Sequence, residues 1–218
     1  MNLRELATEK ITIISGPYGS GKTNIAVNLA MSVASGGEVC RIADLDIVNP
    51  YFRSADNEEM LKELGVETMI PEFANTNVDI PGLPSNYRLL FAGEGKSIAD
   101  VGGDADGAAV LGFSHDDYIE AGYKMYFVYN RYRYVTVSPE GALEVLQGIE
   151  RASGLKFHGI INNSNIGEET TEETVLNAIK CAEEFASLAN LPLLMTTAPD
   201  WLDIPNTVKI KDITKKLF

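Results

Sequence analysis

The chain contains one segment whose residue types and spacing point directly to a chemistry. Residues 16–23 read GPYGSGKT and fit the pattern G-x-x-x-x-G-K-[ST] at every fixed position, between an apolar run and a helical pattern. Glycines let a backbone curl so that its N–H groups meet phosphate oxygens, and the following helix adds the positive end of its dipole. Lys22 is expected to reach the β- and γ-phosphates, and the Thr23 hydroxyl to bind Mg²⁺. We therefore expect a nucleotide site that includes Gly16, Pro17, Tyr18, Gly19, Ser20, Gly21, Lys22, Thr23 and Asn24.

Acidic residues at the ends of two expected strands supply the other half of such a site. Asp44 and Asp46 close one strand and alternate onto one face of it. The carboxyl ends of strands in an α/β sheet form the rim of the ligand crevice, so both carboxylates would share that rim with the phosphate loop. Asp100 ends another strand, and Gly103 after it offers an N–H to a γ-phosphate. The candidate metal ligands are thus Thr23, Asp44 and Asp100, and the candidate catalytic residues are Lys22 and Asp46, the latter to orient or deprotonate water.

Strand and helix patterns alternate along the chain in a way that would bring these residues together. Apolar runs predict strands at 11–15, 39–45, 97–101, 123–129, 157–161 and, as the final strand, 191–195. Helical patterns occur at 23–35, 57–64, 139–152 and 172–189, with a short amphipathic helix around 83–91. The acidic residues Asp104 and Asp106 are expected to lie in a polar loop, and so are residues 115–117. The alternation predicts an α/β fold: a doubly wound, mostly parallel sheet with helices on both faces, as in P-loop NTPases, with residues 1–218 as a single domain.

Composition and charge narrow the function classes. The 218 residues include 31 acidic and 18 basic ones, a net charge of −13 that repels nucleic acid and anionic lipid. No segment approaches the roughly 18 apolar residues of a membrane-spanning helix, and residues 1–10 lack an apolar leader, so a cytoplasmic protein is expected. Cys40 and Cys181 lie far apart and are expected to be reduced thiols.

Four segments in order resemble the MinD/ParA/CobQ group of P-loop ATPases: GPYGSGKTNIAVNLA, ADLDIVNPYFR, ADVGGDADGA and GIINNSN. The resemblance implies an ATP/ADP and Mg²⁺ site in which Asp46 helps to activate water and Asp100 binds the metal. It also implies that Asn162 or Asn163 contacts adenine, although asparagines after a strand are equally typical of a turn. The segment at 162–165 lacks the N-K-x-D pattern of GTPases, which favours ATP over GTP.

The resemblance departs from the group at Pro17, where many members carry a second lysine that reaches a dimer partner's nucleotide. A homodimer of that kind is therefore left open, and Arg53 is the other cation considered for the role. The last residues, 207–218, mix apolar residues with lysines. They are expected to form a terminal strand or helix packed on the domain, with reversible membrane contact as the less favoured alternative.

These features favour a Mg²⁺-dependent ATPase whose hydrolysis cycle switches its interaction with a protein partner. One alternative is a small-molecule phosphotransferase or a ligase similar to CobQ and dethiobiotin synthetase, with Arg131, Arg133 and residues 71–85 at the acceptor site. A second alternative is a nucleotide-binding regulator with little turnover. Arg131 and Arg133 otherwise belong to a surface loop.

Overall fold

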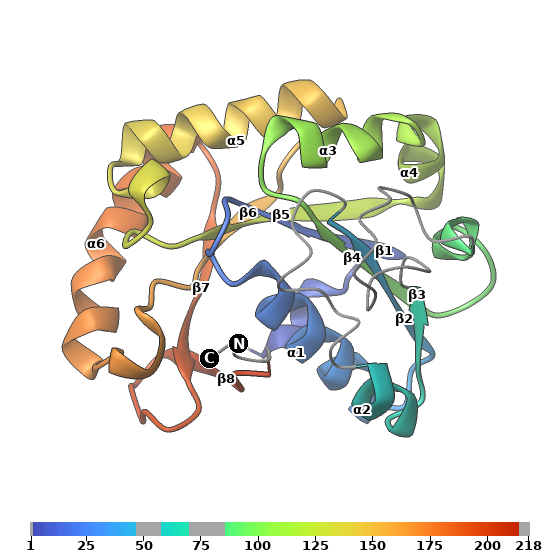
Figure 1. Ribbon diagram of the computed structural model, residues 1–218, viewed down its shortest axis with the longest axis horizontal. Helices are drawn as coiled ribbons and strands as arrows, with labels where there is room; N and C mark the ends of the chain where they lie inside the picture. Colours follow the sequence, from blue (N-terminus) through green and yellow to red (C-terminus); the bar gives the residue numbers. More distant parts are fainter. Residues whose placement is uncertain (1, 47–57, 70–85, 214–218) are drawn as a thin grey trace, which may run out of the picture.

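The computed structural model describes residues 2–46, 58–69 and 86–213, and its centre is an eight-stranded sheet (Figure 1). Each pair of neighbouring strands is parallel. The order across the sheet is β3 (Val66–Met69), β2 (Cys40–Leu45), β4 (Lys96–Val101), β1 (Ile11–Ser15), β5 (Tyr123–Tyr129), β6 (Gly159–Asn162), β7 (Leu193–Pro199) and β8 (Thr207–Ile210).

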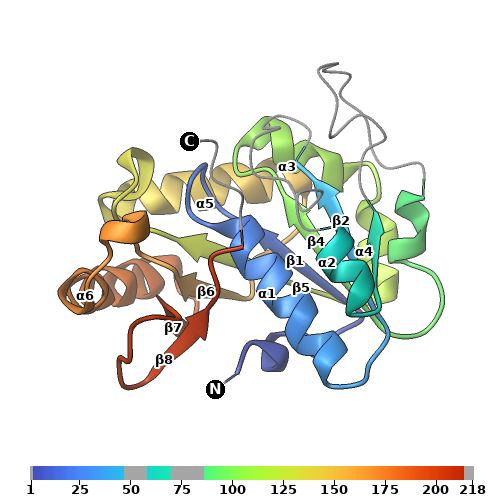
Figure 2. The same cartoon turned by 60° about the horizontal axis from the view of Figure 1, so that its bottom comes forward.

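Helices cover both faces of this sheet, and strand residues alternate between two hydrophobic cores. Ile13 of β1 belongs to the core that β1 shares with α3 (Ala105–Gly112), α4 (His115–Ala121), α5 (Pro139–Ser153) and α6 (Glu172–Ala189). Its neighbour Ile14 belongs to the opposite core, with α1 (Lys22–Ser35) and α2 (Glu58–Glu63), which come forward in Figure 2. The predicted doubly wound α/β architecture is therefore confirmed.

The order of the strands locates the crevice in which such folds bind ligands. The chain passes from β1 toward the β3 edge and, after β4, crosses to β5 and continues toward the β8 edge. The direction reverses beside β1, and the loop that follows β1 is the segment 16–21. Open α/β sheets bind ligands outside the carboxyl ends of strands at such a point of reversal.

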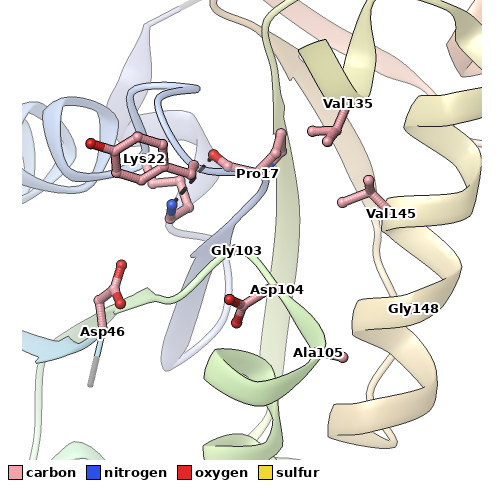
Figure 3. Close-up of a pocket in the computed structure, with 10 residues that line it drawn as sticks. Pro17, Lys22, Asp46, Gly103, Asp104, Ala105, Val135, Val145 and Gly148 are labelled. Atoms are coloured by element: carbon pink, nitrogen blue, oxygen red, sulfur yellow. Dashed lines mark hydrogen bonds between the residues drawn. The ribbon is translucent and has the colours of Figure 1, made fainter. Parts of the chain in front are cut away.

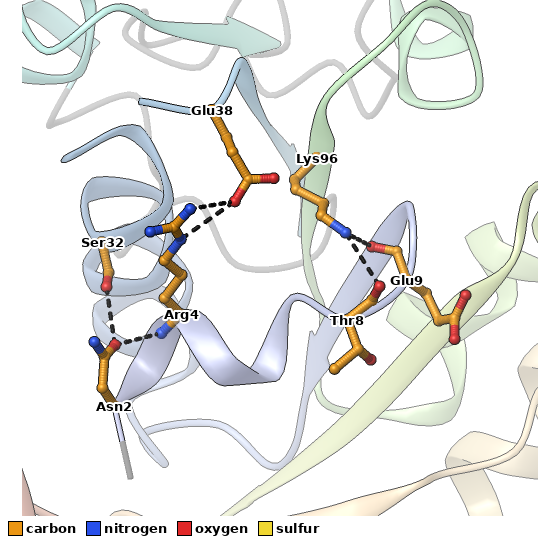
Figure 4. A network of polar contacts seen from close by, with 7 residues as sticks. All are labelled: Asn2, Arg4, Thr8, Glu9, Ser32, Glu38 and Lys96. Atoms are coloured by element: carbon orange, nitrogen blue, oxygen red, sulfur yellow. Dashed lines mark hydrogen bonds and ion pairs between the residues drawn. The ribbon is translucent and has the colours of Figure 1, made fainter. Parts of the chain in front are cut away.

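Polar contacts fix the amino-terminal segment against α1 and the start of β4 (Figure 4). Arg4, in the 3₁₀ helix Leu3–Leu6, pairs with Glu38 at 2.8 Å, and Asn2 accepts hydrogen bonds from Arg4 N and from Ser32 of α1. Lys96 at the start of β4 donates to the carbonyl oxygens of residues 8 and 9. These contacts hold the C-terminal part of α1 and the start of β4. The candidate site residues lie at the opposite ends of these elements, at the start of α1 and the end of β4.

Several sequence-based expectations differ from the structure. The acids at 104–106 do not form a loop, because Asp104 caps α3 by accepting a hydrogen bond from Gly107 N at 2.7 Å. Residues 115–117 open helix α4 rather than a polar loop. The strand expected to be final is β7, and β8 follows it, with the remainder of the tail, 214–218, outside the described residues. Strand β3 and helix α3 were not predicted, the first because it is short and the second because its alanines and glycines give little periodicity.

The expected short helix near 83–91 is the 3₁₀ helix Tyr87–Leu90. Arg53 and residues 71–85 lie outside the described residues, and so do the first residues of the run at 83–91. No helix in the described part of the chain is long and apolar enough to cross a membrane.

Candidate functional site

The glycine-rich segment joins β1 to α1 with a backbone that only glycines adopt readily. Gly16, Gly19 and Gly21 have φ values of 146°, 73° and 88°, and Gly21 directly precedes the first residue of α1. A Cβ atom on Gly16 would lie 2.5 Å from the carbonyl oxygen of Val128, so the loop passes too close to β5 for any side chain. The sequence pattern thus lies between a strand and a helix, as the phosphate-loop hypothesis requires.

Side chains from distant parts of the chain hold this loop by its carbonyl groups. Arg133 Nε donates to Gly19 O at 2.7 Å, and Asn163 Nδ2 donates to Ser20 O at 2.8 Å. Because the C=O and N–H of a trans peptide point in opposite directions, the second contact turns the N–H of Gly21 away from Asn163. Asn163 is itself oriented by Thr197, whose hydroxyl donates to Asn163 Oδ1 at 2.6 Å.

Lys22 and Thr23 begin α1 and lie against the carboxyl end of β4. Lys22 is buried, and its Nζ lies 3.4 Å from Pro17 O within the loop. The Thr23 hydroxyl donates to Asp100 Oδ2 at 2.6 Å. Thr23 and Asp100 are 77 residues apart in the sequence, and the pairing of β1 with β4 brings them together.

The predicted carboxylates meet at the same edge. Asp44 of β2 and Asp100 of β4 are directly paired across the sheet and are fully buried, while Asp46 N donates to Asp44 Oδ1 at 3.1 Å. Burial raises the pKa of Asp100 to about 7; Lys22 and the Thr23 hydroxyl oppose this rise, and the charge of Asp46 adds to it. A positive charge placed here would favour the ionised form of Asp100.

The donor set of this edge fits Mg²⁺. Among the described residues Asp100 Oδ1 and Ser20 Oγ are buried and accept or donate no hydrogen bond. No group of three or more His, Cys, Asp or Glu side chains suited to a metal occurs in the described ranges. Mg²⁺ is ordinarily held by one or two carboxylates together with phosphates and water, so a site with Thr23 and Asp100 needs no larger cluster.

The loop after β4 touches the phosphate loop. A Cβ atom on Gly103 would lie 1.8 Å from Gly16 O, so the two backbones are in contact at this glycine. A cavity of about 340 Å³ opens beside them (Figure 3). It is lined by Pro17, Tyr18, Lys22, Asp46, Gly103, Asp104, Ala105, Val135, Val145 and Gly148.

A second, smaller hollow lies on the other side of the loop, at the carboxyl ends of β6, β7 and β8. It measures about 40 Å³ and is lined by Asn24, Asn163, Asn165, Gly167, Thr197, Pro199, Trp201, Ile210 and Asp212. Asn163 therefore reaches both this hollow and the phosphate loop. Asn162 lines neither described cavity, because its buried side chain bonds to Thr196 and Ser164.

The sequence missed most of the residues of this hollow and the anchoring role of Arg133. Trp201 and Asp212 were not singled out, although both follow strand ends, which is the signal that could have found them. Arg131, considered with Arg133 for an acceptor site, instead donates to Asn177 O in α6 at 2.9 Å. Asn24 Nδ2 donates to Asp212 Oδ1 at 3.1 Å, which joins the first turn of α1 to the segment after β8.

Comparisons with known protein families and with curated proteins find no match. Solved structures match over most of this chain. FtsY from Mycoplasma mycoides matches with a TM-score of 0.56 and 15% identity, over 88% of this chain and 61% of that one. The 54 kDa protein of the signal recognition particle from Aeropyrum pernix, in complex with GDP, matches with a TM-score of 0.55 and 17% identity, over 87% of this chain and 41% of that one.

A nucleotide-binding protein from Archaeoglobus fulgidus, in complex with ADP, matches with a TM-score of 0.50 and 15% identity, over 89% of this chain and 84% of that one. The chain spans less than two thirds of the first two proteins. None of the three is described as a MinD, ParA or CobQ protein, so membership of that group stays a prediction. At these identities the likeness concerns the fold, and the chain has the doubly wound fold of P-loop NTPases.

Proposed function

We propose that the chain binds a nucleoside triphosphate with Mg²⁺ and hydrolyses it. The proposal rests on one observation: the Thr23–Asp100 hydrogen bond of 2.6 Å joins the end of the phosphate loop to a buried carboxylate with an unpaired oxygen. Thr23 and Asp100 would hold Mg²⁺, with Asp44 beside them, and the ion would neutralise charge on the phosphates when bound. Two of the structurally similar proteins form complexes with GDP and with ADP, which agrees with a nucleotide ligand.

The residues of the site divide the chemical work. N–H groups of the loop and the Lys22 ammonium would bind the phosphate chain, and Gly103 N–H would meet its last phosphate. Asp46, at the edge of the same cavity as Lys22, would orient the attacking water and accept its proton. The smaller hollow near Asn163 and Trp201 would receive the base. We favour ATP because the segment 162–165 lacks an N-K-x-D pattern.

Calorimetry and a turnover assay test this proposal. We expect MgATP to bind the full chain, more tightly than MgGTP, and Lys22→Ala to abolish binding. ADP release by the full chain should fall at least about a hundredfold in Asp46→Asn, since general bases contribute about that much. Absence of binding to both nucleotides would refute the nucleotide site. Tight binding with turnover equal to that of Asp46→Asn would instead support a regulator with little turnover.

We further propose that hydrolysis switches the interaction of this chain with a protein partner. We also propose that the chain acts as a single domain and works in the cytoplasm. Retention of a partner by the immobilised protein with a non-hydrolysable ATP analogue, and its loss with ADP, would support this. Size measurement with the same ligands tests the homodimer that Pro17 leaves open.

A small-molecule transferase is the second candidate, and one observation favours it. The cavity of about 340 Å³ beside Lys22 and Asp46 has a size typical of small-ligand sites. Its lining includes neither Arg131 nor Arg133 among the described residues, so an acceptor there would be recognised by other groups.

A further inference from the structure

The cavity beside the phosphate loop has two chemically different sides. In Figure 3 Lys22 and Asp46 lie on one side, Val135 and Val145 project from the other, and Asp104 lies between them. The polar side is the one at which the phosphate chain would end. The apolar side lies along α5, where Val145 and Gly148 offer no hydrogen-bond donor or charge to a phosphate group.

Gly148, in the middle of α5, lines the cavity on the apolar side. A Cβ atom built on Gly148 would have no neighbour nearer than Arg151 Nη2 at 4.0 Å, so packing within the described part of the chain does not require glycine here. Gly141 in the same helix differs, because its Cβ would lie 2.9 Å from Val135 O. Glycine weakens a helix interior, and at position 148 it lines the cavity without a side chain.

The charges around the cavity select the kind of ligand. Asp46 and Asp104 carry carboxylates into it, and a bound triphosphate would add negative charge near Lys22. With the nucleotide bound, its phosphates offset the charge of Lys22, so an anionic end group would be repelled, whereas an ammonium group would be attracted. Val135, Val145 and the open surface of Gly148 suit a branched or ring-shaped hydrocarbon body.

We propose that this cavity binds a small organic amine with a branched or ring-shaped apolar body, next to the phosphate chain. Its location relative to the nucleotide rests on the proposed function, but the recognition of the amine depends on the chain's own carboxylates and apolar wall. The ammonium lies between Asp46 and Asp104, and the body lies against Val145 and Gly148.

Isoamylamine, isoamyl alcohol and isovalerate test the proposal, because they share one body and differ in their end group. Saturation-transfer NMR with the full chain in the presence of MgADP should detect isoamylamine most strongly and isovalerate least. Gly148→Leu, which fills the open wall, should weaken amine binding about tenfold or more. Gln147→Leu is the control: it adds the same side chain at the adjacent position of α5. Gln147 is exposed and does not line the cavity, so this variant should leave amine binding unchanged.

Three results would overturn the inference: isovalerate binding as well as the amine, none of the compounds binding, or Gly148→Leu binding the amine like the unmodified chain. If Gly148→Leu does not fold, Gly148→Ala adds one methyl group and should give a smaller loss in the same direction. A parallel MgATP titration of the unmodified chain separates the two proposals. Nucleotide binding without amine selectivity defeats this inference alone, and amine selectivity without nucleotide binding defeats the proposed function alone.

Discussion

Replacing Asn163 by alanine distinguishes two roles for this side chain: holding the phosphate loop and contacting the base. In the structure its Nδ2 donates to Ser20 O at 2.8 Å and its Oδ1 accepts from Thr197 at 2.6 Å, with the side chain almost fully buried. Asn163→Ala removes both hydrogen bonds. Thr197 has a second acceptor in Asn162 O at 3.3 Å, so the carbonyl of Ser20 bears most of the cost. We expect the free energy of unfolding to fall by about 2 kcal/mol, the scale of one lost hydrogen bond and one buried acceptor left unpaired.

The effect on ligands follows from which part of the nucleotide the loop binds. If Asn163 holds the loop, alanine should weaken inorganic tripolyphosphate and MgATP alike, each about tenfold, which corresponds to about 1.4 kcal/mol. If Asn163 contacts the base, tripolyphosphate should bind as before and only MgATP should weaken. Urea denaturation gives the stability, and calorimetry with both ligands gives the affinities.

Asn162→Ala is the matched control, because Asn162 is also buried but bonds to Thr196 and Ser164 rather than to the loop. It should lower stability by a similar amount and leave tripolyphosphate affinity unchanged. Unchanged tripolyphosphate binding in Asn163→Ala, together with a fall in the control, would refute the loop-holding role.

Three further predictions concern other contacts of the site. Gly103→Ala places a methyl group 1.8 Å from Gly16 O, so it should lower the free energy of unfolding by about 3 kcal/mol and abolish nucleotide binding, as denaturation and calorimetry would reveal. Because burial raises the pKa of Asp100 to about 7, the folded chain binds a proton that the unfolded chain has already lost between about pH 4 and pH 7. The free energy of unfolding should therefore fall as the pH rises through this range, by up to about 1.4 kcal/mol per pH unit. Urea midpoints of Asp100→Asn should lack this fall. Asn28→Ala removes two hydrogen bonds between the Asn28 side chain and the backbone of Lys211, of 3.0 Å to its N and 2.9 Å to its O. The amide hydrogen of Lys211 should therefore exchange with solvent faster, and the free energy of unfolding should drop by about 1–2 kcal/mol. Unchanged hydrogen exchange at Lys211 would contradict this role of Asn28.

The parts of the site that could be predicted are those in which a short segment determines its own structure. The glycines of the phosphate loop, the lysine and the threonine are contiguous, so their spacing carries the whole signal. The helix expected at 139–152 is α5, and its start is likewise local: Pro139 is its first residue and Ser138 accepts a hydrogen bond from Gly141 N. The buried strand at 96–101 was found despite weak hydrophobicity, since small residues such as Ser97 and Ala99 suffice between two neighbouring strands.

The missed parts depend on the order of strands, which no local pattern contains. Asn163 and Ser20 are 143 residues apart and meet because β6 follows β5 across the sheet from β1. The asparagines were interpreted as a base contact or as a turn after a strand, and the carbonyl that Asn163 binds could not be identified without the geometry of the loop. Asp212 is similar, since its partner Asn24 lies in the first turn of α1, 188 residues earlier.

The loop between the two cavities is held from both sides, and this arrangement links them physically. Asn163, which lines the smaller hollow, bonds to Ser20 O, while Arg133, two residues before the cavity-lining Val135, bonds to Gly19 O. Adjacent carbonyls of one loop are therefore fixed by side chains that follow two different strands, β5 and β6; of these, Asn163 lines the smaller hollow and Arg133 lines neither cavity. We predict that a ligand that displaces Asn163 from the smaller hollow, or one beside Val135 that displaces Arg133, also shifts the loop, so that ligands in the two cavities change each other's affinity.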